Sequence, residues 1–352
     1  ADLKRRGRPL KRNGSASIWD MGDDVLLVEY HSKMNAVDPF IVEMLVDAVD
    51  MAAIASAKWR GKGDKMAADA AAVEAMRITF DNVPFDGRVA IGEGERDEAP
   101  MLYIGELLGS EIGNPNVPVI DIAVDPLECT NNCADNLPNS IAVLAAAPRG
   151  TLLHAPDCYM DKIAAGPDME GHISLDAGVA YNIEQVASVL DKPVEEVRII
   201  ALDRPRHHDL FKEIKQIGSQ LHLMSDGDIA AALWAARPEG EHDMLLGIGA
   251  APEGVITATA IRGIGGVFEG RLVFRSDEEE ARAANMIDDD LTRLWDAKDL
   301  CQSEDAIFVA SGVCDGYLPG VTHNTDGTLT TYAEMIDVEK QTLTRHDRIH
   351  RL

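Results

Sequence analysis

The sequence is short of basic residues and has no long apolar run. Lys and Arg total 33 against 60 Asp and Glu, which gives a net charge of −27. Such a field repels nucleic acid and anionic lipid, so neither is expected as a partner. No apolar run approaches the roughly 20 residues that a membrane-spanning helix needs. The basic N-terminus has no apolar stretch behind it, which argues against a secretory signal.

Cysteine is also scarce, with five residues scattered along 352. An odd, scattered set in a chain of this size does not indicate a disulfide framework, and it predicts a reducing, cytoplasmic location. Cys129 and Cys133 lie on one short loop, but no second Cys/His pair has the spacing that would complete a zinc site. We interpret them as ordinary thiols, with a redox-sensitive pair as the alternative.

The hydrophobic pattern predicts alternating helices and strands. Apolar residues at helical spacing indicate a helix over 39–60, and a second helix over about 65–80 follows a Gly-rich break. Two short strands are expected within 16–30. Further strands are predicted over 88–93, 117–123, 141–146, 197–202, 220–224, 244–249, 266–275 and 306–311, with helices over 208–217, 226–236 and 253–262. This alternation favours a layered α/β fold, and the Pro-, Gly- and Asp-rich stretch 147–176 suggests a division of the chain near it.

Acidic residues gather at the ends of three predicted strands. They lie in 92–98 (GEGERDE), in 125–130 (DPLECT) and at Glu253 in APEG. Acids at one strand end commonly cap helices and stay solvated, but three such clusters at one sheet edge would repel one another strongly. Divalent cations with a preference for oxygen ligands resolve that repulsion, so we predict Mg²⁺ or Mn²⁺ there. Asp125 and Glu128 would bind through their side chains and Leu127 through its carbonyl, and Thr130 would orient a water.

These motifs resemble a known enzyme family. The pattern D-P-x-[DE]-G-T is the metal-binding motif of the lithium-sensitive phosphatase superfamily. Seven stretches occur in the order found in class II fructose-1,6-bisphosphatase, and they are most similar to the cyanobacterial type that also hydrolyses sedoheptulose 1,7-bisphosphate. The resemblance covers about residues 44–352 and rests on 52–69, VAIGEGERDEAPMLYIGE (89–106), IDIAVDP (120–126), APDCYMDKIAA (155–165), LDRPRHHDL (202–210), SDGDIAAA (225–232) and GIGAAPEGVITA (247–258).

The resemblance implies a fold and a set of site residues. The fold would be the layered α-β-α-β-α sugar-phosphatase sandwich, with a metal- and phosphate-binding half over 41–175 and a sugar-binding half over 176–352. Two or more metal ions would be held, one by Asp69 and Glu93 and another by Asp125, Glu128 and Glu253. The substrate would be contacted by Glu128, Cys129, Thr130, Tyr159, Arg204, Pro205, Arg206, Asp226, Gly227, Asp228 and Ala250.

The implied reaction is hydrolysis of the 1-phosphate of a sugar bisphosphate, in gluconeogenesis or the Calvin cycle. Water oriented by Thr130 would attack in line, with Asp97 or Asp69 as the acid/base partner. Lys65, Glu95 and Asp97 would shape the catalytic loop, and Arg204 and Arg206 would hold the distal phosphate. Related phosphatases acting on inositol phosphates or nucleotides are the neighbouring alternative. Relatives of this type form homodimers or homotetramers, and we expect the same here.

The sequence departs from the family pattern in three places. Cys129 stands where the motif has Gly, which costs roughly 1–2 kcal/mol if that backbone is left-handed. A turn rich in Gly and Gln is replaced by 134–139 (ADNLPN), where Asn136 can supply the left-handed conformation but Leu137 cannot replace a Gln hydrogen bond. These two changes raise an alternative function, a weakened relative that binds metal and sugar phosphate without efficient turnover. Residues 1–40 instead resemble a fragment of a crotonase-type hydratase, and we expect an appended segment.

Overall fold

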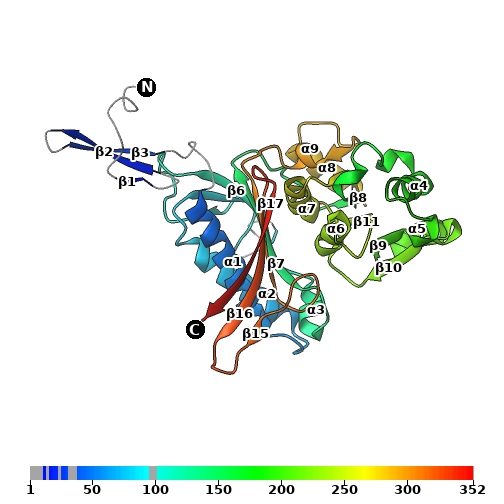
Figure 1. Ribbon diagram of the computed structural model, residues 1–352, viewed down its shortest axis with the longest axis horizontal. Helices are drawn as coiled ribbons and strands as arrows, with labels where there is room; N and C mark the ends of the chain where they lie inside the picture. Colours follow the sequence, from blue (N-terminus) through cyan, green and yellow to red (C-terminus); the bar gives the residue numbers. More distant parts are fainter. Residues whose placement is uncertain (1–10, 13–15, 23–24, 31–37, 95–100, 352) are drawn as a thin grey trace.

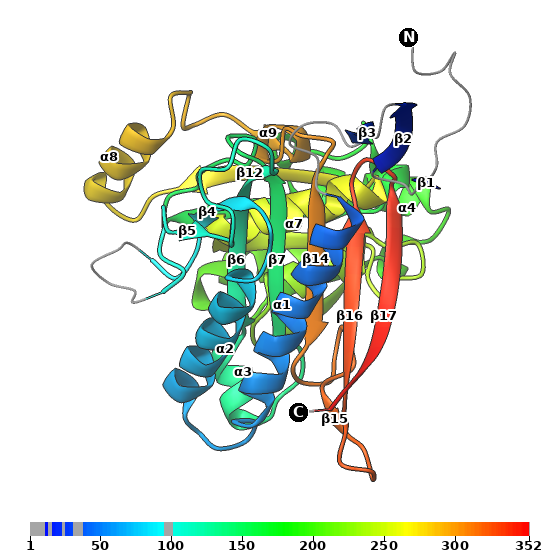
Figure 2. The ribbon, with the colours of Figure 1, turned by 90° about the vertical axis from the view of Figure 1, so that its left-hand side faces the viewer.

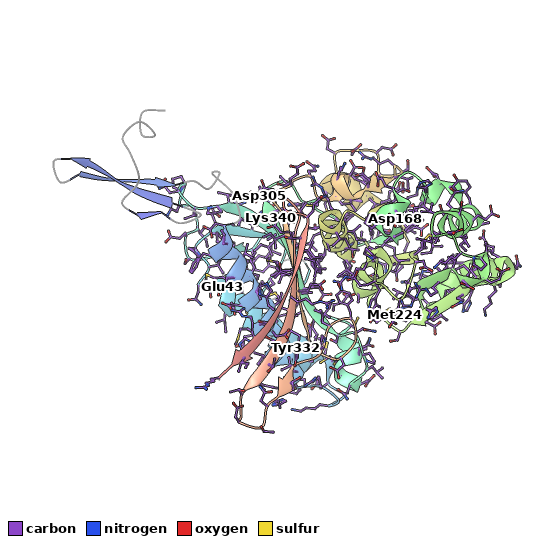
Figure 3. The ribbon with its side chains drawn as sticks, viewed as in Figure 1. Glu43, Asp168, Met224, Asp305, Tyr332 and Lys340 are labelled. Carbon is purple, nitrogen blue, oxygen red and sulfur yellow. The ribbon has the colours of Figure 1, made fainter. Side chains whose placement is uncertain are left out.

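Two β-sheets alternate with three layers of helix, in the order helix, sheet, helix, sheet, helix (Figure 1). This computed structural model describes residues 11–12, 16–22, 25–30, 38–94 and 101–351. Apolar side chains fill the space between the layers (Figure 3). The arrangement confirms the α-β-α-β-α sandwich that the resemblance implied. No helix in the described ranges combines the length and the apolar character needed to cross a membrane.

The larger sheet is made from both ends of the chain. Helices α1 (Pro39–Ala57) and α2 (Lys65–Phe80) cover its outer face (Figure 2), and their apolar sides share one core with the sheet. The Asp38 carboxylate caps α1 by accepting from the N–H groups of Phe40 and Ile41. In spatial order the strands are β15 (Thr322–His323), β16 (Leu329–Asp337), β14 (Ile307–Gly312), β7 (Ile141–Pro148), β6 (Val119–Glu128), β4 (Asp86–Ile91) and β5 (Leu107–Leu108), and β17 (Thr342–His350) pairs with β16.

The smaller sheet lies between two further helix layers. Its strands in spatial order are β10 (Gln220–Met224), β9 (Arg198–Leu202), β11 (Met244–Ala250), β8 (Tyr159–Ala165), β12 (Val267–Val273) and β13 (Trp295–Asp296). Helices α4 (Val179–Val189) and α5 (His208–Ile217) pack on its outer face. The layer between the two sheets holds α6 (Asp228–Ala236), α7 (Ala251–Ile264) and α9 (Ala297–Leu300), and α7 contacts strands of both sheets. Helices α3 (Thr130–Asp135) and α8 (Asp277–Met286) complete the set of α-helices in the described residues.

The chain also forms a small sheet ahead of α1. Strands β1 (Lys11–Arg12), β2 (Ala16–Gly22) and β3 (Val25–Tyr30) pair in an antiparallel order (Figure 1). The two strands expected within 16–30 are therefore present. The role of residues 1–40 stays a prediction.

Strand pairing differs from what the sequence pattern suggested. Strand β8 lies inside the stretch that was interpreted as a division of the chain, yet it pairs with both β11 and β12. Strands β14, β16 and β17, from the C-terminal part of the chain, pair within the larger sheet. The reason is physical: periodicity marks where strands occur, whereas long-range packing decides which of them pair.

Candidate active site

The acidic motifs meet in one cleft of about 430 Å³, at the ends of β4, β6 and β11. Glu93 follows β4, and Glu253 lies in the first turn of α7, directly after β11. Helix α2 contributes Asp69 from the opposite wall. Acids from the three strand-end clusters thus converge, although β4 and β6 belong to the larger sheet and β11 to the smaller one.

A local irregularity in β6 aims its two acids into the cleft. The pairing of β6 with β7 shifts register between Asp125 and Glu128, at the Pro of the D-P-x-E motif. Such bulges bend a strand and redirect its side chains. Asp125 Oδ1 accepts from the Leu127 N–H at 3.0 Å, and Ser140 Oγ donates to the Glu128 carbonyl oxygen at 3.0 Å. These bonds fix the backbone that carries both carboxylates.

Three carboxylates lie close enough to share one cation. Oxygen atoms of Asp125, Glu128 and Glu253 all lie within 4.8 Å of one another. Glu253 Oε2 is buried and has no hydrogen-bond partner within the part of the chain that the structure describes. A buried carboxylate oxygen without a partner is costly. The donor set is all oxygen, so a hard divalent cation such as Mg²⁺ or Mn²⁺ fits it.

The pKa values of the acids in the cleft also indicate a site for a divalent cation. Burial, with the nearby charge of Asp125, raises the pKa of Asp69 to about 6 and that of Glu93 to about 8. Burial and the charge of Asp228 raise the pKa of Glu253 to about 7. The pKa of Glu128 also rises well above its ordinary value because the side chain is buried beside Asp125. Without a metal ion, Glu93 therefore stays largely protonated at neutral pH, because burial and the neighbouring carboxylates disfavour its ionised form.

A buried lysine, which the sequence reasoning missed, balances part of this charge. Lys162 on β8 is 1% exposed, and its Nζ lies 2.6 Å from Asp228 Oδ2. Gly249 leaves room for the pair, because a Cβ there would lie 1.8 Å from Asp228 Oδ2. The available signal was a lysine followed by the apolar residues IAA in the stretch YMDKIAA. Lysine is rarely buried without a charged partner.

Breaking this pair should destabilise the fold. We expect Lys162→Met to lower the free energy of unfolding by about 3–5 kcal/mol, because Asp228 would be left buried without a cation. Urea unfolding of the metal-free protein measures this change. The double variant Lys162→Met/Asp228→Asn is the matched control and should recover most of the loss. If Lys162→Met lowers the free energy of unfolding by less than about 1 kcal/mol, the pair contributes no more than an exposed ion pair does, and its role as a buried ion pair would be contradicted.

Cys129 and Asn136, which lie where the sequence departs from the family pattern, have the left-handed backbone conformation that was considered for them. Cys129 has φ 64° and Asn136 has φ 54°, so both residues adopt the left-handed conformation at either end of α3. Burial raises the pKa of the Cys129 thiol well above its ordinary range, which keeps the sulfur protonated. Cys133 is directed away from the cleft, where its Sγ donates to the Ser56 carbonyl oxygen at 3.6 Å. Leu137 is 44% exposed.

The predicted sugar-binding residues gather beside the acids. Arg204 Nη2 lies 2.9 Å from Asp226 Oδ1, and Arg206 Nε donates to the Ile248 carbonyl oxygen at 2.9 Å. The guanidinium carbons of Arg206 and Arg275 each lie 4.7 Å from the ring centre of Tyr159. Arg275 follows β12, and no sequence pattern marked it as a site residue. It comes close to Tyr159 because β12 pairs with β8 in this register.

His207 has a structural role. The Ile248 N–H donates to its Nε2 at 2.7 Å, so Nδ1 carries the proton and donates to the Leu202 carbonyl oxygen at 2.7 Å. Both ring nitrogens are engaged by backbone. Pro205 precedes this residue in a short 3₁₀ helix, Pro205–His207.

The remaining predicted site residues lie in different places. Thr130, Ala250 and Asp226 line the cleft, together with Asp157, which the sequence reasoning did not single out. Gly227 lies beside Cys129, since a Cβ added there would be 2.8 Å from its Sγ. Lys65 is the exposed first residue of α2 and is not among the residues that line the cleft. Two predicted catalytic residues, Glu95 and Asp97, lie outside the described residues.

Comparison with known proteins decides the family. The sequence profile of bacterial fructose-1,6-bisphosphatase, glpX-encoded, matches residues 40–350. The chain belongs to this family. Its members are phosphoric monoester hydrolases, which agrees with an acid-lined cleft suited to divalent cations. The match begins at residue 40, so the resemblance of residues 1–40 to a hydratase fragment stays a prediction.

Curated relatives cover nearly the whole chain. Three of them are named D-fructose 1,6-bisphosphatase class 2/sedoheptulose 1,7-bisphosphatase. The protein of Prochlorococcus marinus is 42% identical, covering 83% of this chain and 90% of its own length. The protein of Thermosynechococcus vestitus is 41% identical, with 87% and 94% covered. That of Parasynechococcus marenigrum is 44% identical, with 84% and 91% covered.

Proposed function

We propose that this chain hydrolyses the 1-phosphate of fructose 1,6-bisphosphate and the corresponding phosphate of sedoheptulose 1,7-bisphosphate. The observation that carries the proposal is the convergence of Asp125, Glu128 and Glu253 within 4.8 Å, with one Glu253 oxygen buried and unpaired. The relatives' names supply the substrate class. The reaction would take place in the cytoplasm, in gluconeogenesis or the Calvin cycle, in a homodimer or homotetramer.

The metal ligands would divide into two groups. Asp69 and Glu93 would hold one ion, and Asp125, Glu128 and Glu253 a second, with Mg²⁺ or Mn²⁺ as the ion. When bound, such ions neutralise phosphate charge and lower the pKa of water. Because the chain carries a net charge of −27, a bisphosphate would otherwise be repelled from this cleft.

The side chains around the cleft would position the reacting groups. Thr130, at the start of α3, would orient the attacking water by hydrogen bonding. Asp69 is one candidate for the acid/base partner of that water. Asp97 is the other acid/base candidate. In-line attack needs the distal end of the sugar to be fixed, because a small misplacement costs much of the rate.

The arginines would fix that distal end. The guanidinium groups of Arg206 and Arg275 both lie against the ring of Tyr159. Each guanidinium group is planar and carries N–H donors at its edge. Guanidinium groups bind phosphate in a bidentate manner. Arg204 is held by Asp226, which would orient it beside the sugar.

A phosphate-release assay tests the proposal. Both sugar bisphosphates are supplied with Mg²⁺ and, separately, with Mn²⁺, and inositol monophosphate and a nucleotide serve as comparison substrates. We expect release from both sugars and little from the comparison substrates. No phosphate release with either metal would contradict the proposal. Faster release from inositol monophosphate or from the nucleotide would indicate that the enzyme is a phosphatase for that substrate instead.

Cys129 can be used to test the second candidate function, a relative that binds metal and sugar phosphate without efficient turnover. We expect Cys129→Gly to change kcat/KM by less than about threefold, because the backbone already has the left-handed conformation that Gly would adopt. Steady-state kinetics with fructose 1,6-bisphosphate measures this ratio. A gain of roughly tenfold or more, equal to about 1.4 kcal/mol, would instead locate a defect at this position. The relatives' names do not favour that outcome.

A further inference from the structure

Strand β17 forms a long open edge of the larger sheet. It pairs with β16 through nine consecutive residue pairs without a bulge, from Thr342 opposite Asp337 to His350 opposite Leu329. Within the described ranges no strand pairs with its other side, which faces outward in Figure 2. Its sequence, TLTRHDRIH, has neither the Pro nor the Lys residues that most often protect such edges, and its charged residues are Arg345, Asp347 and Arg348. Unpaired N–H and C=O groups along this edge can accept another strand.

The sequence of β17 is complementary to itself. When two copies run antiparallel about a two-fold axis at His346, Arg345 lies opposite Asp347 of the second copy. Leu343 then lies opposite Ile349 of the second copy. Symmetry produces each pair twice, which gives two ion pairs and two apolar pairs across the strands.

Neighbouring registers are unfavourable. A two-fold axis that relates antiparallel strands must pass through a residue, because side chains opposite each other lie on the same face of a sheet. Moving the axis to residue 345 places Arg345 against its own copy. Moving it to residue 347 places Asp347 against its own copy. Like charges directly opposite are destabilising, so the register centred on His346 is selected.

The two faces of β17 have different roles. Arg348 and His350 are directed toward α1, where Arg348 Nη2 lies 2.6 Å from Asp47 Oδ1 and His350 Nε2 lies 3.7 Å from Asp50 Oδ2. The other face carries Leu343, Arg345, Asp347 and Ile349, the residues that form the proposed pairs.

That second face is exposed at Ile349 and Arg345, whereas Leu343 is half-buried against the core between the two sheets. Ile349 is 71% exposed, and the Arg345 side chain is 63% exposed although it approaches Glu334 at 3.6 Å. An exposed isoleucine on an open strand edge is the kind of residue that strand pairing buries.

We propose that a second copy of this chain pairs with β17 in an antiparallel manner about His346, which joins the two larger sheets into one continuous sheet. This inference names the surface for the homo-oligomer expected above, and it does not depend on the proposed reaction. In the sheet order, β16, β14 and β7 separate β17 from β6 and β4, whose ends form the cleft. Turnover therefore reports on the site independently of assembly.

Cysteine cross-linking tests the register. Residues directly opposite in an antiparallel pair have Cα atoms about 4.5–5.5 Å apart, within the range of about 4.4–6.8 Å that a disulfide spans. We expect His346→Cys to form a covalent dimer under mild oxidation, reversed by reductant. Thr344→Cys is the matched control, since two such residues would lie four positions apart along the strands. The five native cysteines are buried, which keeps the background low.

Mass measurement tests the contacts. Sedimentation equilibrium of the full chain should show a dimer or a multiple of it. Ile349→Asp and Asp347→Arg should each weaken dimerisation at least tenfold, about 1.4 kcal/mol, while Ile349→Val should not. Both substituted side chains tolerate the change in the single chain, because Ile349 is exposed and Tyr332, labelled in Figure 3, is the β16 neighbour of residue 347.

Several results would overturn this inference. They are a monomeric wild type at the highest concentration tested, unchanged mass in both charged variants, or cross-linking of Thr344→Cys in place of His346→Cys. A tetramer that falls to dimers in the charged variants supports it, because β17 is then one of two interfaces. Phosphate release, followed in parallel, distinguishes a failed interface from a failed assignment of function.

Discussion

Glu253→Gln should lower kcat/KM for fructose 1,6-bisphosphate on the order of 10³-fold. The substitution keeps the shape of the side chain but removes one negative charge from the trio with Asp125 and Glu128, whose oxygens lie within 4.8 Å of one another. A neutral amide oxygen binds a divalent cation far more weakly than a carboxylate does. Phosphate release at increasing Mn²⁺ or Mg²⁺ measures the loss and shows whether excess metal restores part of it.

The same variant should gain stability when metal is absent. Ionisation of Glu253 is costly in the folded chain, since its pKa there is about 7 against an ordinary value near 4.5. At about pH 8 the amide avoids that cost, so the free energy of unfolding should rise in EDTA. Glu280→Gln on the exposed surface of α8 is the matched control and should change neither quantity. Retained activity, or lower stability without metal, would contradict the assigned role of Glu253.

The metal-free protein should lose stability as pH rises from about 5 to about 8. The folded chain keeps protons on Asp69, Glu253 and Glu93, whose pKa values are about 6, 7 and 8. The unfolded chain has already released these protons above about pH 4.5. Because the folded state binds more protons throughout this window, rising pH favours unfolding. The loss should be on the order of 7 kcal/mol, or about 10 °C in Tm.

Adding metal should remove most of this pH dependence. Divalent cations bind the ionised carboxylates, so Mn²⁺ or Mg²⁺ should raise Tm most at about pH 8 and least at about pH 5. Thermal unfolding in EDTA and in metal, across this range, measures both curves. Asp121 does not mask the effect, because its pKa lies at about 2 and its ion pairs weaken only at much lower pH. Stability that rises with pH in EDTA, or a metal gain independent of pH, would contradict the prediction.

Much of the candidate site could be predicted from local sequence. GEGE and APEG each follow an apolar strand and D-P-x-E ends one, and side chains at strand ends project from the sheet edge whatever the rest of the fold does. The left-handed conformations at Cys129 and Asn136 were likewise predictable, because they depend on the turn in which each residue lies.

Other parts of the site depend on contacts between distant segments. Lys162 compensates Asp228 only because β8 packs against α6, which begins at Asp228, and Arg275 reaches Tyr159 only because β12 pairs with β8. No local pattern carries that information, since β8 lies in a stretch whose Pro, Gly and Asp content suggests loop.

The sequence by itself therefore determined the elements, the acidic motifs and the family to which they belong. Tertiary structure alone decided which strands are neighbours, which charge is buried against which, and which strand is left at an open edge. The physical reason is that hydrophobic periodicity and turn chemistry act over a few residues. Strand order and charge pairing follow from packing between segments that lie far apart in the chain.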